Sequence, residues 1–217
     1  MPRASRILVA DDTPTIRLGL SVLLNRQAGL KVCGEAHDRS SLLKAVSEFN
    51  PDLVVADVFL RESSGLLLIG AIRNHHVGTK VLVHTGYDEV LFAERAVRAG
   101  AAGYVMKREP AATVVKAVRH ILKGGIFVTP RATGSLLHQM AGRHSQSGSR
   151  LQSLSDREME VLRRMGEGFT SREMAHAMHV SIKTVEAHRE HIKAKLGLES
   201  GSGLLRLAIQ WAKSAPG

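Results

Sequence analysis

The chain has 217 residues and a formal net charge of +10, and 44% of its residues are hydrophobic while only 4% are aromatic. This length allows one large domain or two small ones with aliphatic cores, and the positive charge suits a polyanionic partner such as nucleic acid. The single cysteine excludes an internal disulfide, and the absence of a bilayer-spanning apolar run or a signal peptide predicts a cytoplasmic protein.

Short apolar runs alternate with amphipathic stretches through the first 125 residues. This alternation indicates an α/β domain, placed at residues 5–125, in which helices cover both faces of a parallel sheet. The runs are nearly continuous, as is typical of buried parallel strands. Strands are predicted near 6–10, 31–35, 52–56, 80–84 and 103–106, and helices near 14–27, 39–49, 65–75, 88–99 and 110–123.

Residues 126–150 predict a connection between two domains. Thr129 and Pro130 mark the start of a short helix that reaches Met140. Residues 142–150 contain no large apolar side chain, which indicates a flexible linker.

The pattern of residues 151–217 is wholly helical and predicts a small domain of four helices. The third helix is predicted over 182–196, and the fourth runs through Leu204 and Trp211. About four residues separate the second helix from the third, which is the spacing of a helix-turn-helix. Capping residues mark the first three starts: Ser155 with Glu158, Thr170 with Glu173, and Ser181.

Polar side chains directly follow four of the predicted strands: the pair Asp11 and Asp12, then Asp57, Thr85 and Lys107. Because the carboxyl ends of parallel strands meet at one edge of a sheet, we expect these side chains to converge. Clustered carboxylates favour Mg²⁺, and a carboxylate can accept a phosphoryl group. A hydroxyl and an ammonium group would then bind the phosphoryl oxygens. The sequence therefore predicts a phosphorylation site.

Residues 5–125 resemble the receiver domain of bacterial two-component response regulators, through the segments 7–12, 51–65, 81–87 and 99–107. The resemblance implies a flavodoxin-like fold of five parallel strands in the order 2-1-3-4-5. It also implies that Asp57 is the phosphoacceptor. The resemblance further implies that Mg²⁺ is bound by Asp12, Asp57, the main-chain carbonyl of Phe59 and, mainly through water, Asp11. Thr85 and Lys107 would bind the phosphoryl group, and Tyr104 would move inward as part of the switch.

The surroundings of this site depart from the family pattern. The family usually has proline where Arg61 stands, and the guanidinium of Arg61 is close enough in sequence to reach the phosphoryl group. Phe59 and Tyr87 stand two residues after Asp57 and Thr85. We hypothesise that these two aromatic rings exclude attacking water and lengthen the lifetime of the phosphorylated state.

Residues 153–211 resemble the LuxR-type helix-turn-helix of NarL/FixJ-type regulators, through the segments 154–162, 168–175 and 181–198. A helix-turn-helix places its second helix in the major groove. Residues 151–217 carry 10 basic and 8 acidic side chains, so we expect weak non-specific binding. The resemblance implies base contacts by Glu186, Ala187 and Glu190 and phosphate contacts by Lys183, Thr184, Arg189 and Lys195.

Two histidines, His188 and His191, lie on the predicted recognition helix. No cysteine or carboxylate stands at a suitable sequence spacing to complete a metal site with them. We therefore interpret both as hydrogen-bonding or half-buried histidines.

These observations predict a cytoplasmic, DNA-binding transcription regulator that a partner histidine kinase phosphorylates and that binds paired half-sites as a homodimer. It is not expected to be an enzyme, because phosphatases with an aspartyl nucleophile on a similar fold generally need a second acid where this chain has Phe59. The alternative is a DNA-binding regulator controlled by a ligand, a protein partner or dimerisation, independently of phosphorylation.

Overall fold

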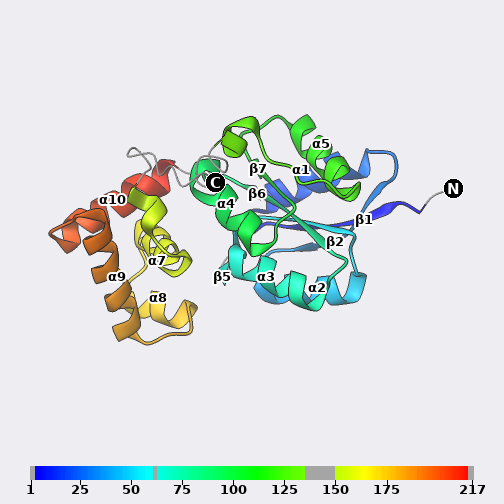
Figure 1. The fold of residues 1–217 in the computed structure, drawn as a ribbon. Coiled ribbons are helices and arrows are strands. Elements are labelled where there is room, and N and C mark those ends of the chain that lie inside the picture. The colour runs from blue at the N-terminus through cyan, green and yellow to red at the C-terminus, as the bar shows by residue number, and fades with distance from the viewer. Residues whose placement is uncertain (1–2, 61–62, 135–149, 215–217) are drawn as a thin grey trace. The chain divides into compact units, whose positions relative to one another are not determined.

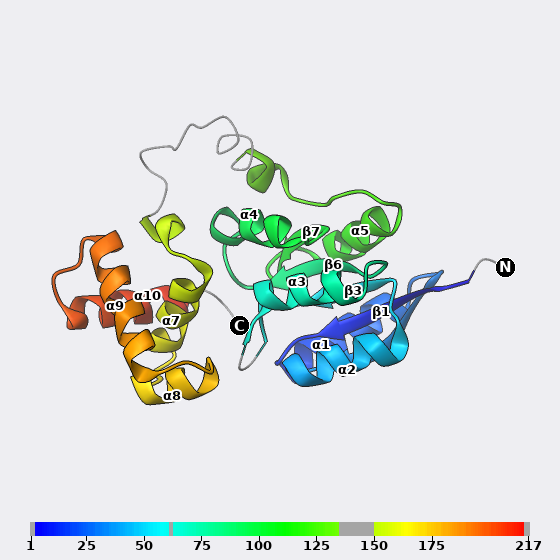
Figure 2. The ribbon, with the colours of Figure 1, turned by 60° about the horizontal axis from the view of Figure 1, so that its bottom comes forward.

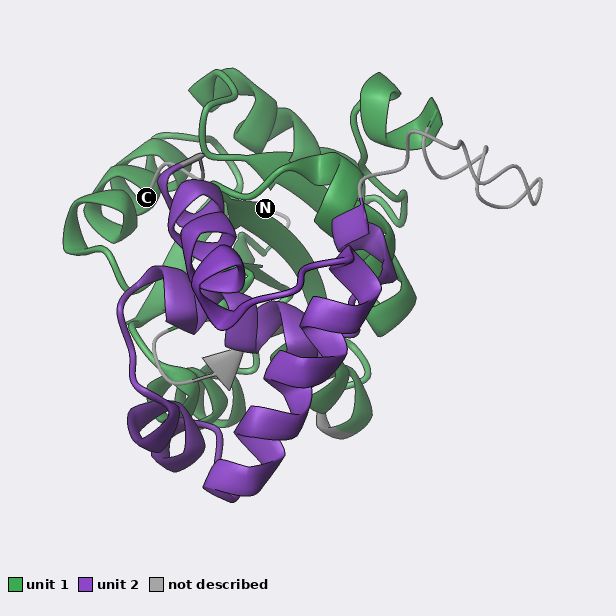
Figure 3. Ribbon diagram, turned by 90° about the vertical axis from the view of Figure 1, so that its left-hand side faces the viewer, with its two compact units in different colours: residues 1–137, 217 green, residues 138–216 purple. Residues whose placement is uncertain are grey.

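The computed structural model describes residues 3–60, 63–134 and 150–214. The chain divides into two compact units, Met1–Leu137 and His138–Pro216 (Figure 3). Within the described ranges, no helix is both long enough and apolar enough to cross a membrane.

The first unit is built on a five-stranded parallel sheet (Figures 1 and 2). In terms of the sheet strands alone its order is 2-1-3-4-5, which confirms the prediction. Its strands are β1 (Ser5–Ala10), β2 (Leu30–Ala36), β3 (Leu53–Ala56), β6 (Lys80–Thr85) and β7 (Gly103–Met106), joined in the order β2-β1-β3-β6-β7.

Five helices cover the two faces of this sheet. They are α1 (Pro14–Asn25), α2 (Arg39–Phe49), α3 (Gly65–His75), α4 (Glu89–Ala99) and α5 (Ala111–Leu122). Helices α1 and α5 lie on one face, and α2, α3 and α4 lie on the other (Figure 1). The alternating direction of strand side chains divides the core. Ile7 and Val9 of β1, for example, join Leu24 and Val118 in the fully buried cluster beneath α1 and α5.

Two features of this unit were not predicted from the sequence. A short antiparallel pair, β4 (Phe59–Leu60) with β5 (Ser63–Ser64), follows directly after Asp57. Arg61, whose role in this loop was a sequence prediction, lies outside the described residues. The second feature is a capping box at the start of α2, where Asp38 and Ser41 each bind the other's backbone amide.

The segment that leaves the first unit runs along the edge of the sheet. Phe127 forms a parallel bridge with Gly103 of β7, and Tyr104 N donates to Phe127 O at 2.9 Å. Residues 130–134 are helical, and Thr129 Oγ1 accepts a hydrogen bond from Ala132 N at 3.2 Å. The rest of the predicted linker helix and residues 142–149 lie outside the described ranges.

The second unit contains the four predicted helices, preceded by a 3-10 turn. Helices α8 (Ser171–Ala177) and α9 (Ile182–Leu196) form the helix-turn-helix, and His179 between them adopts a left-handed conformation with φ 54°. The capping boxes predicted at Ser155 and Thr170 are both present, and Ser181 caps α9 through Thr184 N. The elements are η1 (Arg150–Ser153), α7 (Asp156–Gly166), α8 (Ser171–Ala177), α9 (Ile182–Leu196) and α10 (Gly201–Ser214).

Candidate functional site: an acidic sheet edge and a recognition helix

The backbone of Asp57 continues the pairing of β3 with β1 beyond the end of the strand. Its amide donates to Ala10 O at 2.9 Å, which places Asp57 beside Asp11, the first residue after β1. Lys107, the first residue after β7, is held in the same way because its amide donates to Thr85 O at 2.7 Å. The sheet ladders therefore position these side chains at one edge.

The side chains of Asp11, Asp57, Thr85 and Lys107 meet in a directly connected group. Thr85 Oγ1 donates to Asp57 Oδ1 at 2.6 Å. Lys107 Nζ lies 2.7 Å from Asp57 Oδ2 and 2.9 Å from Asp11 Oδ2, so its ammonium bridges the two carboxylates. The amide of Phe59 also donates to Asp57 Oδ1, at 3.2 Å. Four of the five side chains that the sequence placed at this edge are thus in contact, and Asp12 is the exception.

Burial dominates the electrostatics of this group. Asp57 is only 8% exposed, and its burial raises the pKa of the carboxyl despite the opposing effects of Lys107 and Thr85. Burial acts to lower the pKa of Lys107, but Asp57 and Asp11 outweigh it and the pKa is raised. Lys107 therefore keeps its positive charge beside an aspartate whose negative charge is costly.

The charges of Lys107 and Asp11 also act on His84, the residue before Thr85. Burial and the charge of Lys107 lower its pKa to about 4, although Asp11 acts in the opposite direction. The Nδ1 atom of His84 is buried and has no hydrogen-bond partner among the described residues. His84 is therefore neutral at physiological pH.

The acidic edge has the donor set that a hard divalent cation requires. Asp11 and Asp57 are both buried, and a carboxylate oxygen of each contacts the ammonium group of Lys107. Asp12 is half-buried next in the chain, and its Oδ1 accepts a hydrogen bond from Thr13 Oγ1 at 3.3 Å. Because Mg²⁺ prefers oxygen ligands and tolerates several bound waters, these residues fit it.

Tyr104 lies fully buried and apart from the directly connected group. Its hydroxyl donates to Tyr87 O at 2.9 Å, on the loop that follows Thr85. The rings of Phe59, Tyr87 and Phe92 form a cluster beside the site, with ring centroids 4.8 Å apart for Phe59 and Tyr87. The two aromatic residues singled out in the sequence are therefore in direct contact.

Residues 126–134, which we call the exit segment, contact α4 in a way that the sequence did not predict. Thr129 Oγ1 donates a short hydrogen bond to Glu89, a buried residue in the first turn of α4. Arg131 Nη2 lies 3.4 Å from Oδ2 of Asp88, the N-cap residue of the same helix. Acidic residues such as Asp88 and Glu89 are common at a helix start because they interact favourably with the helix dipole. Their presence in the sequence therefore does not indicate that Thr129 and Arg131 contact them.

The recognition helix α9 has one buried and one exposed side. Val185, Ile192 and Leu196 are buried, as predicted. The side predicted to face DNA includes the exposed residues Lys183, Glu186, Ala187 and Glu190 and the half-buried residues Thr184 and Arg189.

Two of the basic residues predicted to contact phosphate already have partners within the unit. Arg189 Nη1 donates to Ser171 Oγ at 2.9 Å and to Glu186 Oε1 at 3.2 Å, so it joins α9 to the start of α8. Lys195 is exposed but donates to Glu158 Oε2 of α7 at 2.7 Å. Both residues would have to share or exchange these partners in order to bind a phosphate.

Two family models match the chain and together cover most of it. The model of the response regulator receiver domain matches residues 7–119. The model of bacterial regulatory proteins of the luxR family matches residues 152–208.

Individual relatives agree with these matches. The chain is 33% identical to the oxygen regulatory protein NreC of Staphylococcus aureus (strain JH9) over 210 residues, which cover 94% of this chain and 97% of NreC. A two-component response regulator of the LuxR family from Aurantimonas sp. SI85-9A1 is 31% identical, with a TM-score of 0.60 over 64% of this chain and 99% of that one. The fold is shared with RcsB from Salmonella enterica serovar Typhimurium, in a structure bound to promoter rprA in the presence of phosphomimetic BeF3-. The TM-score is 0.75 and the sequence identity 24%, and the match covers 95% of this chain and 99% of RcsB.

Proposed function

Because this chain belongs to the two-component response regulators that join a receiver domain to a LuxR-type DNA-binding domain, we propose that phosphorylation of Asp57 controls its binding to DNA. The phosphoryl donor is a partner histidine kinase. We place the receiver domain at residues 5–125, the linker at 126–150 and the DNA-binding domain at 151–217. The observation that carries the proposal is the direct contact of Asp57 with both Thr85 and Lys107.

In the phosphorylation step, a carboxylate oxygen of Asp57 attacks the phosphorus of the phosphohistidine. A new O–P bond forms as the P–N bond breaks, and the electron pair of that bond returns to the imidazole ring. The raised pKa of Asp57 reflects a charge that its buried surroundings stabilise poorly. Formation of the acyl phosphate moves this charge outward onto the phosphoryl oxygens, to which Thr85 and Lys107 can donate hydrogen bonds.

Mg²⁺ would neutralise charge on the transferring group. Asp11, Asp12, Asp57 and the main-chain carbonyl of Phe59 would hold it. The ammonium of Lys107 bridges Asp11 and Asp57, so it would also be able to bind the phosphoryl group on Asp57.

The phosphoryl group would act on the rest of the receiver through Thr85 and Tyr104. Thr85 cannot keep its hydrogen bond to Asp57 Oδ1 unchanged once that carboxylate carries a phosphoryl group. The loop after Thr85 contains Tyr87, whose carbonyl accepts from Tyr104, and Tyr104 N in turn holds Phe127 of the exit segment. A shift in this region would change the surface formed by α4, β7 and α5 and the attachment of the exit segment.

This change would favour a homodimer that presents two recognition helices to paired DNA half-sites. Base contacts are assigned to Glu186, Ala187 and Glu190 and phosphate contacts to Lys183, Thr184 and Arg189, with Lys195 contributing less because Glu158 holds it. Since the site is linked to a DNA-binding domain, the aspartyl phosphate would serve as a signal and not as an intermediate of turnover. A cytoplasmic location suits this role and the single cysteine.

Phosphoryl incorporation tests the first part of this proposal, that Asp57 is the phosphoacceptor. Incubation with acetyl phosphate and Mg²⁺ should add the mass of one phosphoryl group to the wild-type chain and none to Asp57→Asn. Incorporation should stop when Mg²⁺ is chelated. Equal incorporation into wild type and Asp57→Asn would show that another residue accepts the phosphoryl group.

A control mode that does not use phosphate is the alternative. In that case a ligand, a protein partner or dimerisation alone would set the DNA-binding state. DNA affinity would then be identical with and without a phosphoryl donor, even if Asp57 were phosphorylated.

A further inference from the structure

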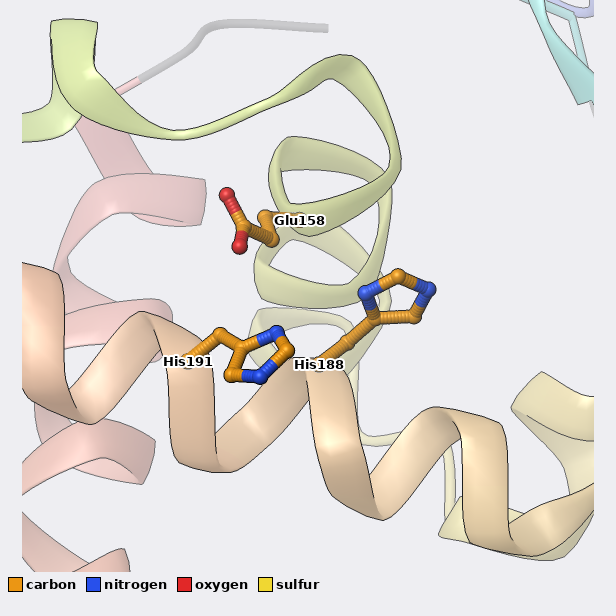
Figure 4. A group of neighbouring side chains, drawn as sticks. All are labelled: Glu158, His188 and His191. Atoms are coloured by element: carbon orange, nitrogen blue, oxygen red, sulfur yellow. The ribbon is translucent and has the colours of Figure 1, made fainter.

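Three side chains that metals commonly bind gather between α7 and α9 of the second unit (Figure 4). Glu158 belongs to the first turn of α7, and His188 and His191 belong to α9. One ligand atom from each residue lies within 4.8 Å of the other two. The sequence indicated no carboxylate partner for the histidines, and the packing of α7 on α9 supplies one.

The fold itself brings these residues together. His188 and His191 are three positions apart on a helix, so their side chains share a face. Glu158 is fixed opposite them because its Oε2 accepts hydrogen bonds from Ser155 N at 2.6 Å and from Lys195 Nζ at 2.7 Å. Within the described part of the chain, neither histidine makes a hydrogen bond or an ion pair that would explain its position.

We propose that Glu158, His188 and His191 form a binding site for a divalent transition-metal ion, Zn²⁺ in particular. Two imidazole nitrogens and one carboxylate oxygen are an established Zn²⁺ ligand set, in which water completes a tetrahedron. Ligand atoms around tetrahedral Zn²⁺ lie about 3.3 Å apart, so distances between the three ligand atoms need to shorten by up to about 1.5 Å. Half-buried His188 and exposed His191 have the freedom to make this rotamer adjustment.

The surroundings of Glu158 support its role as an anionic ligand. Its Oε2 accepts hydrogen bonds from Ser155 N and Lys195 Nζ, which fix the orientation of the carboxylate. Burial acts to raise the pKa of Glu158, but the hydrogen bonds from Lys195 and Ser155 outweigh it and lower the pKa. A ligating carboxylate is typically oriented by such hydrogen bonds from a surrounding shell.

This site differs in chemistry from the acidic edge of the receiver. Imidazole nitrogens suit Zn²⁺ and not Mg²⁺, whereas the receiver edge offers oxygen atoms. A bound ion would join α7 to the recognition helix through two residues that lie three positions apart on α9. Metal binding would thus stabilise the second unit alone and would be independent of Asp57.

Calorimetric titration of the full chain with Zn²⁺, in the presence of excess Mg²⁺, tests the proposal. We expect one Zn²⁺ to bind per chain and His191→Gln to weaken it at least tenfold. The matched control is His176→Gln, which removes an exposed histidine of the same unit from α8 and should bind Zn²⁺ like the wild type. This control is needed because the chain contains 11 histidines.

Thermal unfolding provides a second, independent readout. The single tryptophan, Trp211, belongs to the second unit and both tyrosines, Tyr87 and Tyr104, belong to the first. Zn²⁺ should raise the temperature of the tryptophan transition in the wild type and in His176→Gln, but not in His191→Gln. Failure of Zn²⁺ to bind the wild type, or equal Zn²⁺ affinity in wild type and His191→Gln, would overturn the proposal.

Discussion

The buried histidine beside the phosphorylation site provides a quantitative test of the electrostatics described above. The pKa of His84 is lowered from 6.5 to about 4, first by burial and then by the charge of Lys107. Between these two values the unfolded chain binds a proton at this position and the folded chain does not. Stability is therefore lost as the pH falls from 6.5 towards 4. From pH 7 to pH 5 the loss amounts to about 2 kcal/mol.

The variant His84→Gln keeps a polar side chain but removes this titration. We expect its free energy of unfolding to fall by about 2 kcal/mol less than that of the wild type between pH 7 and pH 5. Denaturant unfolding of the full chain without metal ions, followed by amide hydrogen exchange of the buried strands β1 and β3, reports on the first unit alone.

The pH dependence of a histidine variant away from the site provides the control. The control is His120→Gln, which removes an exposed histidine of the same unit and should follow the wild type. The same pH dependence in wild type and His84→Gln would show that His84 is not held neutral by its surroundings, and the reasoning would fail.

Three further variants test other parts of the structure. Gly103→Ala places a Cβ 2.7 Å from Phe127 O, so we expect a loss of about 1–3 kcal/mol in unfolding free energy and faster amide exchange in the exit segment; unchanged values would contradict the sheet-edge attachment. Phe59→Asn opens the aromatic cluster with Tyr87 to water, so the phosphoryl group should be lost faster than from the wild type, and equal lifetimes would refute the shielding hypothesis. Tyr104→Phe leaves the carbonyl of Tyr87 without its buried donor, which should cost about 1–3 kcal/mol by denaturant unfolding, and a neutral effect would contradict that contact.

The sequence predicted the acidic edge because its geometry follows from strand endings. In a parallel sheet, the residue after each strand arrives at the same edge whatever lies between the strands. Asp57, Thr85 and Lys107 could therefore be placed together from local patterns alone. The helix starts at Ser155, Thr170 and Ser181 were predictable for a similar reason, since capping involves residues only three positions apart.

Contacts that depend on tertiary packing had no comparable local signal. Glu158 lies 30 residues before His188, and only the packing of α7 on α9 brings their side chains together. Phe127 extends the sheet edge through backbone hydrogen bonds, which its side chain does not reveal. Lys195 matched a phosphate-contact position in the motif, but the same packing pairs it with Glu158.

Control of DNA binding by phosphorylation of Asp57 is tested by selection of DNA from a random pool by the full chain, with and without a phosphoryl donor, for wild type and Asp57→Asn. We expect the donor to enrich paired half-sites with the wild type and to have no effect on Asp57→Asn. Identical enrichment by both proteins, independent of the donor, would contradict it.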